Sequence, residues 1–272
     1  NDILQIAKAQ YYPNHLSEFI QVRYGLTLSR EELENFVRLG LWPKNRLVSV
    51  ENENIGHLVP VLQALEQRIL ANAQAERPGL LAYLNNLGLN ATEKSAVVDI
   101  GYAATIQGCL NRLMGQTIHG YYLMTVERAQ KISSEYGAIA QGCFAHCIDP
   151  KIYPMPPIFV KSFWLEKLLS SDDTQVVCYR QADSNGIVPE FRQLAEEERQ
   201  SMAARAEIRR GIMDFIDQSI AIRDKLVSDF EIPSDIATGL FDEFVKRPSQ
   251  AEKEILGKLT LDDHYCGRGL VS

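Results

Sequence analysis

One stretch of the sequence combines residue types that suit the binding of a small anion. An apolar run, Ala96-Val97-Val98, ends in Asp99, and the loop Gly101-Tyr102-Ala103-Ala104 leads to Thr105, where a helical pattern begins. A loop that leaves a parallel strand and enters a helix directs free backbone N–H groups and the positive end of the helix dipole at one point. The sequence therefore predicts a phosphate-binding site made of Asp99, Gly101, Tyr102, Thr105 and Gln107.

The chemistry of this predicted site follows from its residue types. Gly101 and the first amides of the helix would hold phosphate, while Thr105 and Gln107 would fix the orientation of the ligand. Asp99 would orient a ribose or, in a catalytic site, act as a base. The sequence shows neither paired carboxylates nor a nucleophile elbow, so no catalytic residue is assigned and enzymatic activity stays open. A structural interpretation also stays open, in which Thr105 only caps the helix and Gly101 only makes a turn.

The loop departs from three known phosphate-binding motifs. It lacks the Lys of a Walker A loop, and it has one Gly where a dinucleotide fingerprint needs three, so both motifs are excluded. A phosphoribosyltransferase-like enzyme also places an acid after an apolar strand and a Thr-rich loop before a helix. Such enzymes normally have two adjacent acids and a Thr-Gly-Gly-Thr cradle, whereas this chain has one acid and Tyr102-Ala103-Ala104-Thr105. This class is kept as an alternative.

Two other clusters of polar residues are candidate sites. Cys143-Phe144-Ala145-His146-Cys147 brings two thiols and an imidazole together, but a structural zinc needs four ligands and no second pair stands at zinc-like spacing. We therefore expect no structural metal, and no cofactor motif is recognised. His264 stands beside Asp262 and Asp263 with Arg268 nearby. This tail is either catalytic, anion-binding or, as the more frequent explanation, a polar turn.

Charge and composition limit the partners. The chain has 28 Lys and Arg against 35 Asp and Glu, a net charge of -7, which is the wrong sign for a protein that must neutralise nucleic-acid phosphates. No apolar run reaches the length of a membrane span, and the N-terminus has no signal-peptide pattern. The five scattered cysteines are odd in number and indicate reduced thiols in a cytoplasmic protein.

An α/β centre must position the predicted site. Residues 96–100 and 119–124 predict adjacent parallel strands joined by a helix from Thr105 to about Gly115. Residues 174–179 predict a third strand, after a proline-rich loop and a helix. The expected fold class is α/β, with a small parallel Rossmann-like sheet of about three recognisable strands flanked by many helices.

Helical patterns surround this centre. Ser29 to Glu32 and Ser249 to Glu252 are capping boxes, each of which predicts the start of a helix. Pro78 predicts the start of a separate short helix. A long amphipathic helix carries Ile208, Ile212, Phe215, Ile216 and Ile220 on one face. Its charged residues are expected to form a solvated face: Glu196, Glu197, Glu198, Arg205, Arg209 and Arg210.

The expected organisation is a single compact unit over residues 1–272. Within it we expect a helical layer at 1–92, an α/β centre at 93–182 and a helical C-terminal part at 183–272. Because the chain begins without Met and three strands are few for a parallel sheet, a piece of a longer protein is the favoured interpretation. Such a piece would have a sheet edge that is open or paired with another copy. In a complete shortened protein, the helices of residues 12–90 would instead wrap the edge.

The site region also resembles a known family. Val97-Val98-Asp99-Ile100-Gly101-Tyr102-Ala103-Ala104-Thr105-Ile106-Gln107, followed by Gly120-Tyr121-Tyr122-Leu123, is similar to the signature "DIGW-x-GT-x-Q … GYYL". That signature belongs to the region that follows a haloacid-dehalogenase-like hydrolase domain in large bacterial proteins of capsule and lipopolysaccharide synthesis. Similar segments continue in the family's order, so the resemblance covers about residues 55 to 270. Ala104 stands where the family usually has Gly, and no segment of residues 1–95 matches the family's upstream Arg-Asp-Gly motif.

The resemblance implies a function and partners. It implies a cytoplasmic protein of bacterial surface-polysaccharide biosynthesis that binds a nucleotide sugar or sugar phosphate, with glycosyl transfer as the reaction if the chain is an enzyme. A homodimer or an association with a hydrolase or transferase domain is the expected assembly. A non-catalytic scaffold domain of a polysaccharide-synthesis complex stays open as an alternative, and it predicts a large exposed apolar patch.

Overall fold

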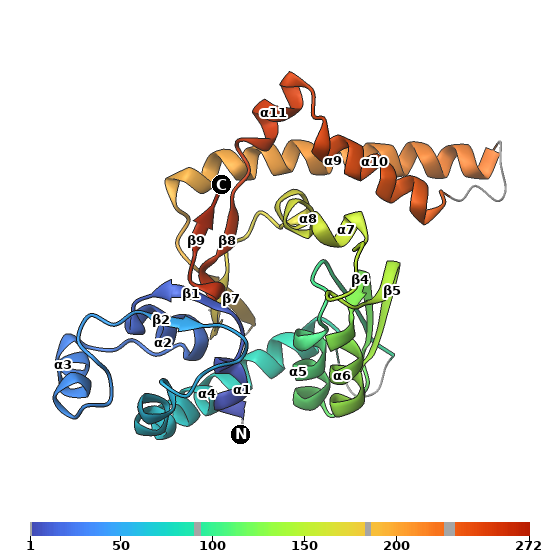
Figure 1. Cartoon of the computed structure of the whole chain (residues 1–272). Helices are drawn as coiled ribbons and strands as arrows, with labels where there is room; N and C mark the ends of the chain where they lie inside the picture. Colours follow the sequence, from blue (N-terminus) through green and yellow to red (C-terminus); the bar gives the residue numbers. More distant parts are fainter. Residues whose placement is uncertain (1, 90–93, 183–185, 226–231) are drawn as a thin grey trace. The chain divides into compact units, whose positions relative to one another are not determined.

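The computed structural model describes residues 2–89, 94–182, 186–225 and 232–272 (Figure 1). Their contacts divide the chain into two compact units. Unit 1 consists of Asn1–Tyr83, Thr174–Gln193 and Leu261–Val271, and unit 2 consists of Leu84–Asp173, Leu194–Thr260 and Ser272. Two later segments of the chain thus belong to unit 1 together with its first part.

Unit 1 combines helices with short antiparallel strand pairs. The pairs are β1 with β2, β6 with β7, and β8 with β9. Its core gathers apolar side chains from the first seventy residues, among them Tyr11, Phe19 and Leu62. The elements are α1 (Asp2–Ala7), β1 (Tyr11–Asn14), α2 (Leu16–Tyr24), α3 (Arg30–Arg38), β2 (Val48–Val50), α4 (Val59–Asn86), β6 (Val176–Gln181), β7 (Ile187–Phe191), β8 (Leu261–Asp263), the 3-10 helix η1 (His264–Cys266) and β9 (Gly269–Val271).

The predicted helix start at Pro78 is wrong, because α4 continues through this residue. Proline removes one helical N–H donor, which usually ends or kinks a helix. Here the flanking turns are held by packing against β6. Gly79 lies against the backbone of Tyr179, where an added Cβ would meet the Tyr179 carbonyl oxygen at 3.0 Å, and the rings of Tyr83 and Tyr179 are 4.8 Å apart. Tertiary contacts thus outweigh the lost hydrogen bond.

Both predicted capping boxes are confirmed. At the start of α3, the Ser29 hydroxyl accepts from the Glu32 N–H, and the Glu32 carboxylate accepts from the Ser29 N–H. Ser249 and Glu252 make the same two bonds at the start of α11 (Gln250–Leu256). Each box satisfies two N–H groups that a helix start would otherwise leave unpaired.

Unit 2 contains the predicted α/β centre. β3 (Ala96–Asp99), α5 (Thr105–Met114), β4 (His119–Val126), α6 (Glu127–Tyr136) and β5 (Ile139–Ile148) follow one another along the chain. β3 pairs in parallel with β4, and β4 pairs in parallel with β5 (Figure 1). The expected strand–helix–strand arrangement and the α/β fold class are confirmed.

The third strand of this sheet is not the one that was expected. Residues 174–179 do enter a strand, β6, but it pairs antiparallel with β7 in unit 1. The third parallel strand is β5, whose sequence is interrupted by Gly142 and whose register shifts twice along β4. These irregularities break the alternating pattern from which a strand is recognised.

The two faces of the parallel sheet differ in their cover. Tyr122 is buried among Ala129 and Ile132 of α6 and Ala104 before α5, so both helices cover its face. On the opposite face, Val98 is 84% exposed and Tyr121 is 43% exposed. The described sheet therefore presents one apolar face that these helices leave uncovered.

Further helices complete unit 2: α7 (Pro157–Val160), α8 (Ser162–Leu169), α9 (Glu196–Lys225), α10 (Ser234–Lys246) and α11. The expectation that all the early charges of α9 are solvated is wrong for Glu198 and Arg205, which are buried. Arg205 donates to the carbonyl oxygens of Lys167, Ser171 and Thr260. These three carbonyl groups supply hydrogen bonds that a buried guanidinium requires. No helix among the described residues is long and apolar enough to cross a membrane.

Candidate functional site

The predicted site occupies the loop at the carboxyl end of β3. Asp99 is the last residue of this strand and Thr105 is the first residue of α5. The Asp99 Oδ1 atom accepts a 2.7 Å hydrogen bond from the Gly101 N–H. A Cβ at position 101 would lie 3.1 Å from this carboxylate, so the tight turn favours glycine. Asp99 thus shapes the loop with one of its oxygens.

Ala104 gives the loop its entry into the helix. This residue is the N-cap of α5 and has φ of 57°, in the left-handed region that favours glycine. Its methyl group is buried against Tyr122, Ala129 and Ile132. Glycine would adopt this backbone conformation without strain.

The amino end of α5 has no side-chain cap. Unlike Ser29 at α3, Ala104 has no side chain that accepts from the first amides of the helix. Thr105 is exposed, and so is the neighbouring Ile106. Backbone N–H groups at an uncapped helix start bind water or an anion, and the helix dipole favours negative charge there.

Tyr102 connects the loop to Phe159 and to the end of β4. Its ring meets the ring of Phe159 edge-on at 5.5 Å, and it packs on the cluster formed by Met124 and Val126. Its carbonyl oxygen accepts from the Val126 N–H at 3.0 Å, which fastens the loop to the end of β4. The ring of Tyr102 therefore lies in an apolar cluster of unit 2.

Gln107 lies in the first turn of α5, and its side chain is almost fully buried. Its Nε2 donates to the carbonyl oxygens of Ile118 at 2.7 Å and Ile139 at 2.9 Å, and its Oε1 accepts from the Tyr122 hydroxyl at 2.9 Å. Burial, together with the charge of Asp99, raises the pKa of Tyr122 to about 12, so its hydroxyl stays protonated as a donor. The side chain of Gln107 thus connects α5 to two strands. Asp99, Gly101 and Thr105, in contrast, belong to the loop and its two ends.

The Cys143 to Cys147 cluster lies in the irregular half of β5. His146 Nδ1 accepts from the Gly142 N–H at 3.2 Å and lies 3.0 Å from the Thr125 hydroxyl oxygen, which accepts from the Cys147 N–H at 2.9 Å. Because a backbone N–H only donates, Nδ1 is the acceptor and the neutral ring carries its proton on Nε2. No group of three side chains suited to a metal was found among the described residues.

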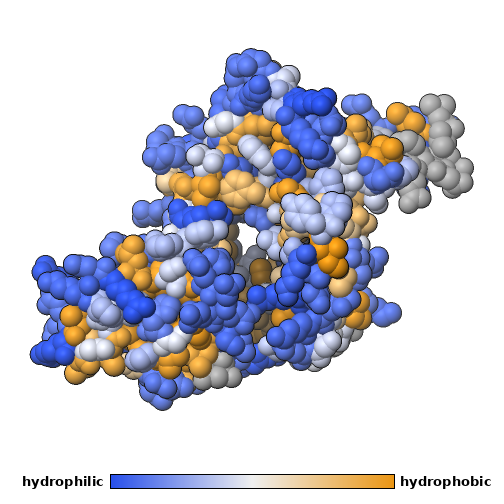
Figure 2. Space-filling model, viewed as in Figure 1, coloured by the Kyte–Doolittle hydropathy of each residue, from blue (hydrophilic) through white to orange (hydrophobic). Residues whose placement is uncertain are grey.

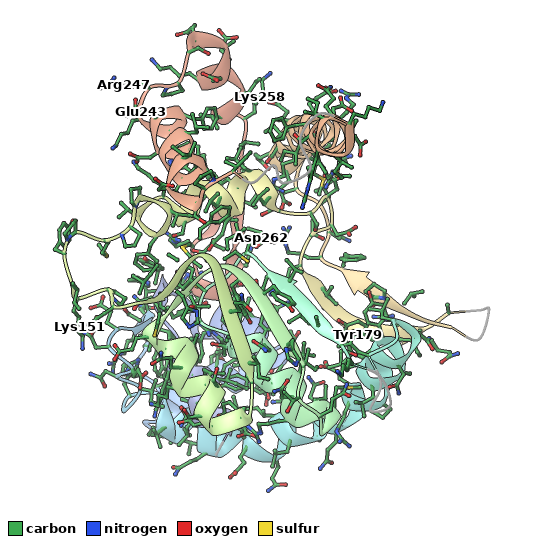
Figure 3. The ribbon with its side chains drawn as sticks, turned by 90° about the vertical axis from the view of Figure 1, so that its right-hand side faces the viewer. Lys151, Tyr179, Glu243, Arg247, Lys258 and Asp262 are labelled. Carbon is green, nitrogen blue, oxygen red and sulfur yellow. The ribbon has the colours of Figure 1, made fainter. Side chains whose placement is uncertain are left out.

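A hydrogen-bonded cluster in unit 1 includes His264. Asp262, which is labelled in Figure 3, accepts from His264 Nδ1 at 2.6 Å and from Arg192 at 2.7 and 3.2 Å. Burial opposes ionisation of Asp262, but the hydrogen bonds from Arg192 and His264 prevail and lower its pKa. Arg268 pairs with Asp263. These contacts fasten the β8–β9 hairpin to the residue that follows β7.

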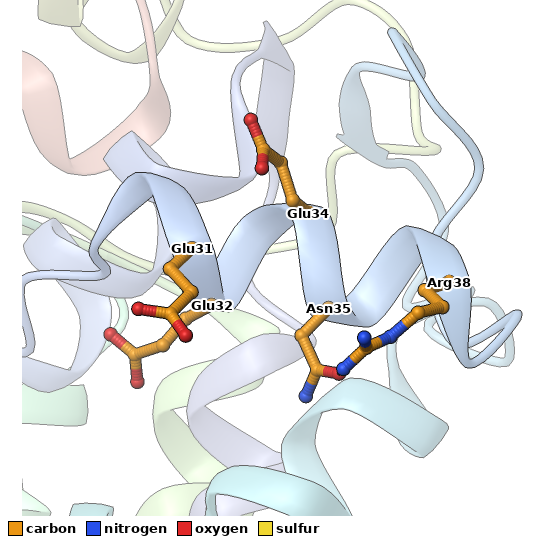
Figure 4. Close-up of a pocket in the computed structure, with 5 residues that line it drawn as sticks. All are labelled: Glu31, Glu32, Glu34, Asn35 and Arg38. Carbon is orange, nitrogen blue, oxygen red and sulfur yellow. The ribbon is translucent and has the colours of Figure 1, made fainter.

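The surface along α3 forms a shallow depression of about 570 Å³ (Figure 4). It is lined by Glu31, Glu32, Glu34, Asn35 and Arg38 of one helix. The Glu32 carboxylate already accepts from the Ser29 N–H and forms an ion pair with Arg68. Arg38 donates to the Asn35 side chain. These side chains spread along the helix in Figure 4 and do not converge on one point.

No family model matches the chain, and a search of curated proteins found no match. The assignment of a function therefore depends on the loop after β3 and on the start of α5.

Proposed function

We propose that this chain is a cytoplasmic protein of bacterial surface-polysaccharide biosynthesis that binds the phosphate-bearing part of a nucleotide sugar or sugar phosphate. The observation that carries this proposal is the parallel β3–α5–β4 unit, with the Asp99 to Thr105 loop at the carboxyl end of its first strand. Ligands of open parallel sheets bind outside this end of the strands. Glycosyl transfer is the reaction that we infer if the chain is an enzyme.

Different residues of the loop would bind different parts of the ligand. The uncapped amides at the start of α5 and the exposed Thr105 hydroxyl would donate to phosphate oxygens. Asp99 uses Oδ1 for the Gly101 amide, which leaves Oδ2 to accept from a sugar or ribose hydroxyl. Tyr102 and Gln107 would act indirectly, by holding the loop and the helix in place.

Calorimetry with common nucleoside diphospho-sugars tests this proposal. We expect Thr105→Val to weaken binding by roughly tenfold, because a hydrogen bond to a charged oxygen contributes about 1.5 kcal/mol. Asp99→Asn should also weaken binding while its amide oxygen keeps the bond to Gly101. Ile106→Ala is the matched control in the same helical turn, since its side chain is 67% exposed and apolar. Equal affinities for the wild type, both site variants and the control would refute the site.

A non-catalytic scaffold domain is the second candidate. It is supported by exposed apolar residues on unit 2, including Val98 on the open sheet face and Phe215 on α9. Monomeric soluble proteins seldom leave large apolar patches in water. Absence of sugar-nucleotide binding, together with specific association through one of these surfaces, would favour the scaffold.

A further inference from the structure

Helices of unit 2 enclose an apolar groove of about 410 Å³. Leu165 and Leu168 of α8 line it together with Ile208 and Ile212 of α9 and with Phe241 and Phe244 of α10. The polar residue at its margin is Glu252, whose carboxylate is already bound to the Ser249 amide in the cap of α11. The lining therefore favours an apolar occupant and offers little to a polar ligand.

An exposed apolar stripe continues from this groove along α9. The first half of the helix is held within unit 2 by buried Ser201 and Arg205. In the second half, Phe215, Ile216 and Ile220 follow Ile212 at helical spacing and are 61%, 40% and 53% exposed. Figure 1 shows this half of α9 extending beyond α8. The same face that is covered at the start of the helix is thus bare at its end.

The exposed apolar side chains of α9 and α10 supply more than half of the area that each partner buries in a stable dimer. Ile236 and Leu240 of α10 are also exposed, by 53% and 67%. With roughly 150 Å² for a fully exposed large apolar side chain, the six residues expose roughly 500 Å². The groove walls add further area, and a stable dimer takes roughly 800 Å² from each partner. Figure 2 shows apolar residues at the surface of these helices.

The charges beside the stripe favour a second copy over a lipid surface. Residues 207–225 contain four basic residues (Arg209, Arg210, Arg223, Lys225) and four acidic ones (Glu207, Asp214, Asp217, Asp224). A helix that lies on an anionic membrane normally has an excess of Lys and Arg on its polar side. Residues 207–225 have no such excess of basic residues, so this segment has no net electrostatic attraction to an anionic membrane.

We propose that two copies of this chain associate through α9 and α10, with the exposed stripe of each lying in the apolar groove of the other. A twofold arrangement repeats the same contact twice, so the groove and the stripe are both covered without any other partner. The interface would bring together α9 and α10 of both copies.

Analytical ultracentrifugation of the full chain tests this proposal from low to high micromolar concentration. The wild type is expected to approach twice the 30.7 kDa mass of one chain. Ile216→Glu with Ile220→Glu should weaken association by roughly 100-fold or more, because carboxylates would be buried without partners. Phe241→Asp should do the same from the groove side. Leu39→Glu, at a 60% exposed leucine in unit 1, is the matched control and should remain dimeric.

Hydrogen exchange in the wild type gives a readout that requires no variant to fold. The amides of residues 212–222 should exchange more slowly as the protein concentration rises. A wild type that stays monomeric, or a dimer that survives the stripe variant, would overturn the proposal. A dimer that survives Phe241→Asp would exclude insertion into the groove. A monomer that sediments with phosphatidylcholine–phosphatidylglycerol vesicles would assign the stripe to a lipid surface instead.

Discussion

The Tyr122 hydroxyl donates a buried 2.9 Å hydrogen bond to Oε1 of Gln107, directly beneath the candidate loop. The amide group of Gln107 donates at the same time to Ile118 and Ile139, so one side chain connects α5 with β4 and with the start of β5. The position of the helix start relative to the sheet therefore depends on a fully satisfied polar network.

Replacement of Gln107 by Leu should strongly destabilise the protein. The substitution keeps the approximate volume but leaves two carbonyl oxygens and the Tyr122 hydroxyl without this partner, at a cost of about 2 to 4 kcal/mol. Urea denaturation measures the change. Gln130→Leu, at an exposed position of α6, is the matched control and should change stability by less than about 0.5 kcal/mol. Equal effects of the two substitutions would show that the network has no special role.

Replacement of Ala104 by Gly should leave stability almost unchanged. Relief of the left-handed backbone gains about 1 to 2 kcal/mol, the lost methyl burial costs about 0.8 kcal/mol, and the greater freedom of Gly in the unfolded chain costs about 0.5 to 1 kcal/mol. Ala104→Val should instead lower the melting temperature clearly, because a β-branched residue is poorly tolerated at positive φ. A large loss of stability in the glycine variant would contradict this balance.

Replacement of Lys167 by Met should stabilise the protein at neutral pH. Lys167 is 2% exposed, and burial together with the nearby Arg205 charge lowers its pKa, although its amine lies over the rings of Phe163 and Trp164. Because the folded state disfavours the charged amine, wild-type stability should rise as the pH rises from the folded pKa toward the ordinary value near 10.4. The methionine variant removes this dependence, so its advantage of about 1 kcal/mol should shrink in alkali.

Denaturation of wild type and variant between neutral and alkaline pH measures that difference. The exposed Lys131, replaced by Met, serves as the control and should show no comparable stabilisation. If Lys167→Met were less stable at every pH, the amine would be contributing more through its contacts with the two rings than its burial costs.

Local sequence patterns predicted the centre of the fold and both capping boxes. The run Ala96 to Asp99 and the helix from Thr105 are short-range features, and their geometry follows from residue type and spacing. β5 was missed because Gly142 and two register shifts interrupt its alternation. The helix start predicted at Pro78 was wrong because α4 packs there against Tyr179, which is distant in the sequence.

The roles of individual site residues were harder to predict than the location of the loop. Gln107 was expected to face a ligand, but its hydrogen-bond partners include Ile139 of the strand that the sequence did not reveal. Arg205 was expected in solvent for a similar reason, since the carbonyl groups that it binds come from other segments of the chain. Periodicity indicates which residues share a helix face, but long-range contacts decide which face is buried.

The most direct test of the proposed function is where a sugar nucleotide binds. Backbone amide shifts can be followed by NMR while a nucleoside diphospho-sugar is added to the full chain, with crystal soaking as a second view. The amides of Gly101 and of Thr105 to Gln107 should show the largest saturable shifts, and ligand phosphate should lie at the start of α5. Saturable shifts confined to other parts of the chain, or bound ligand only elsewhere, would contradict the proposed site.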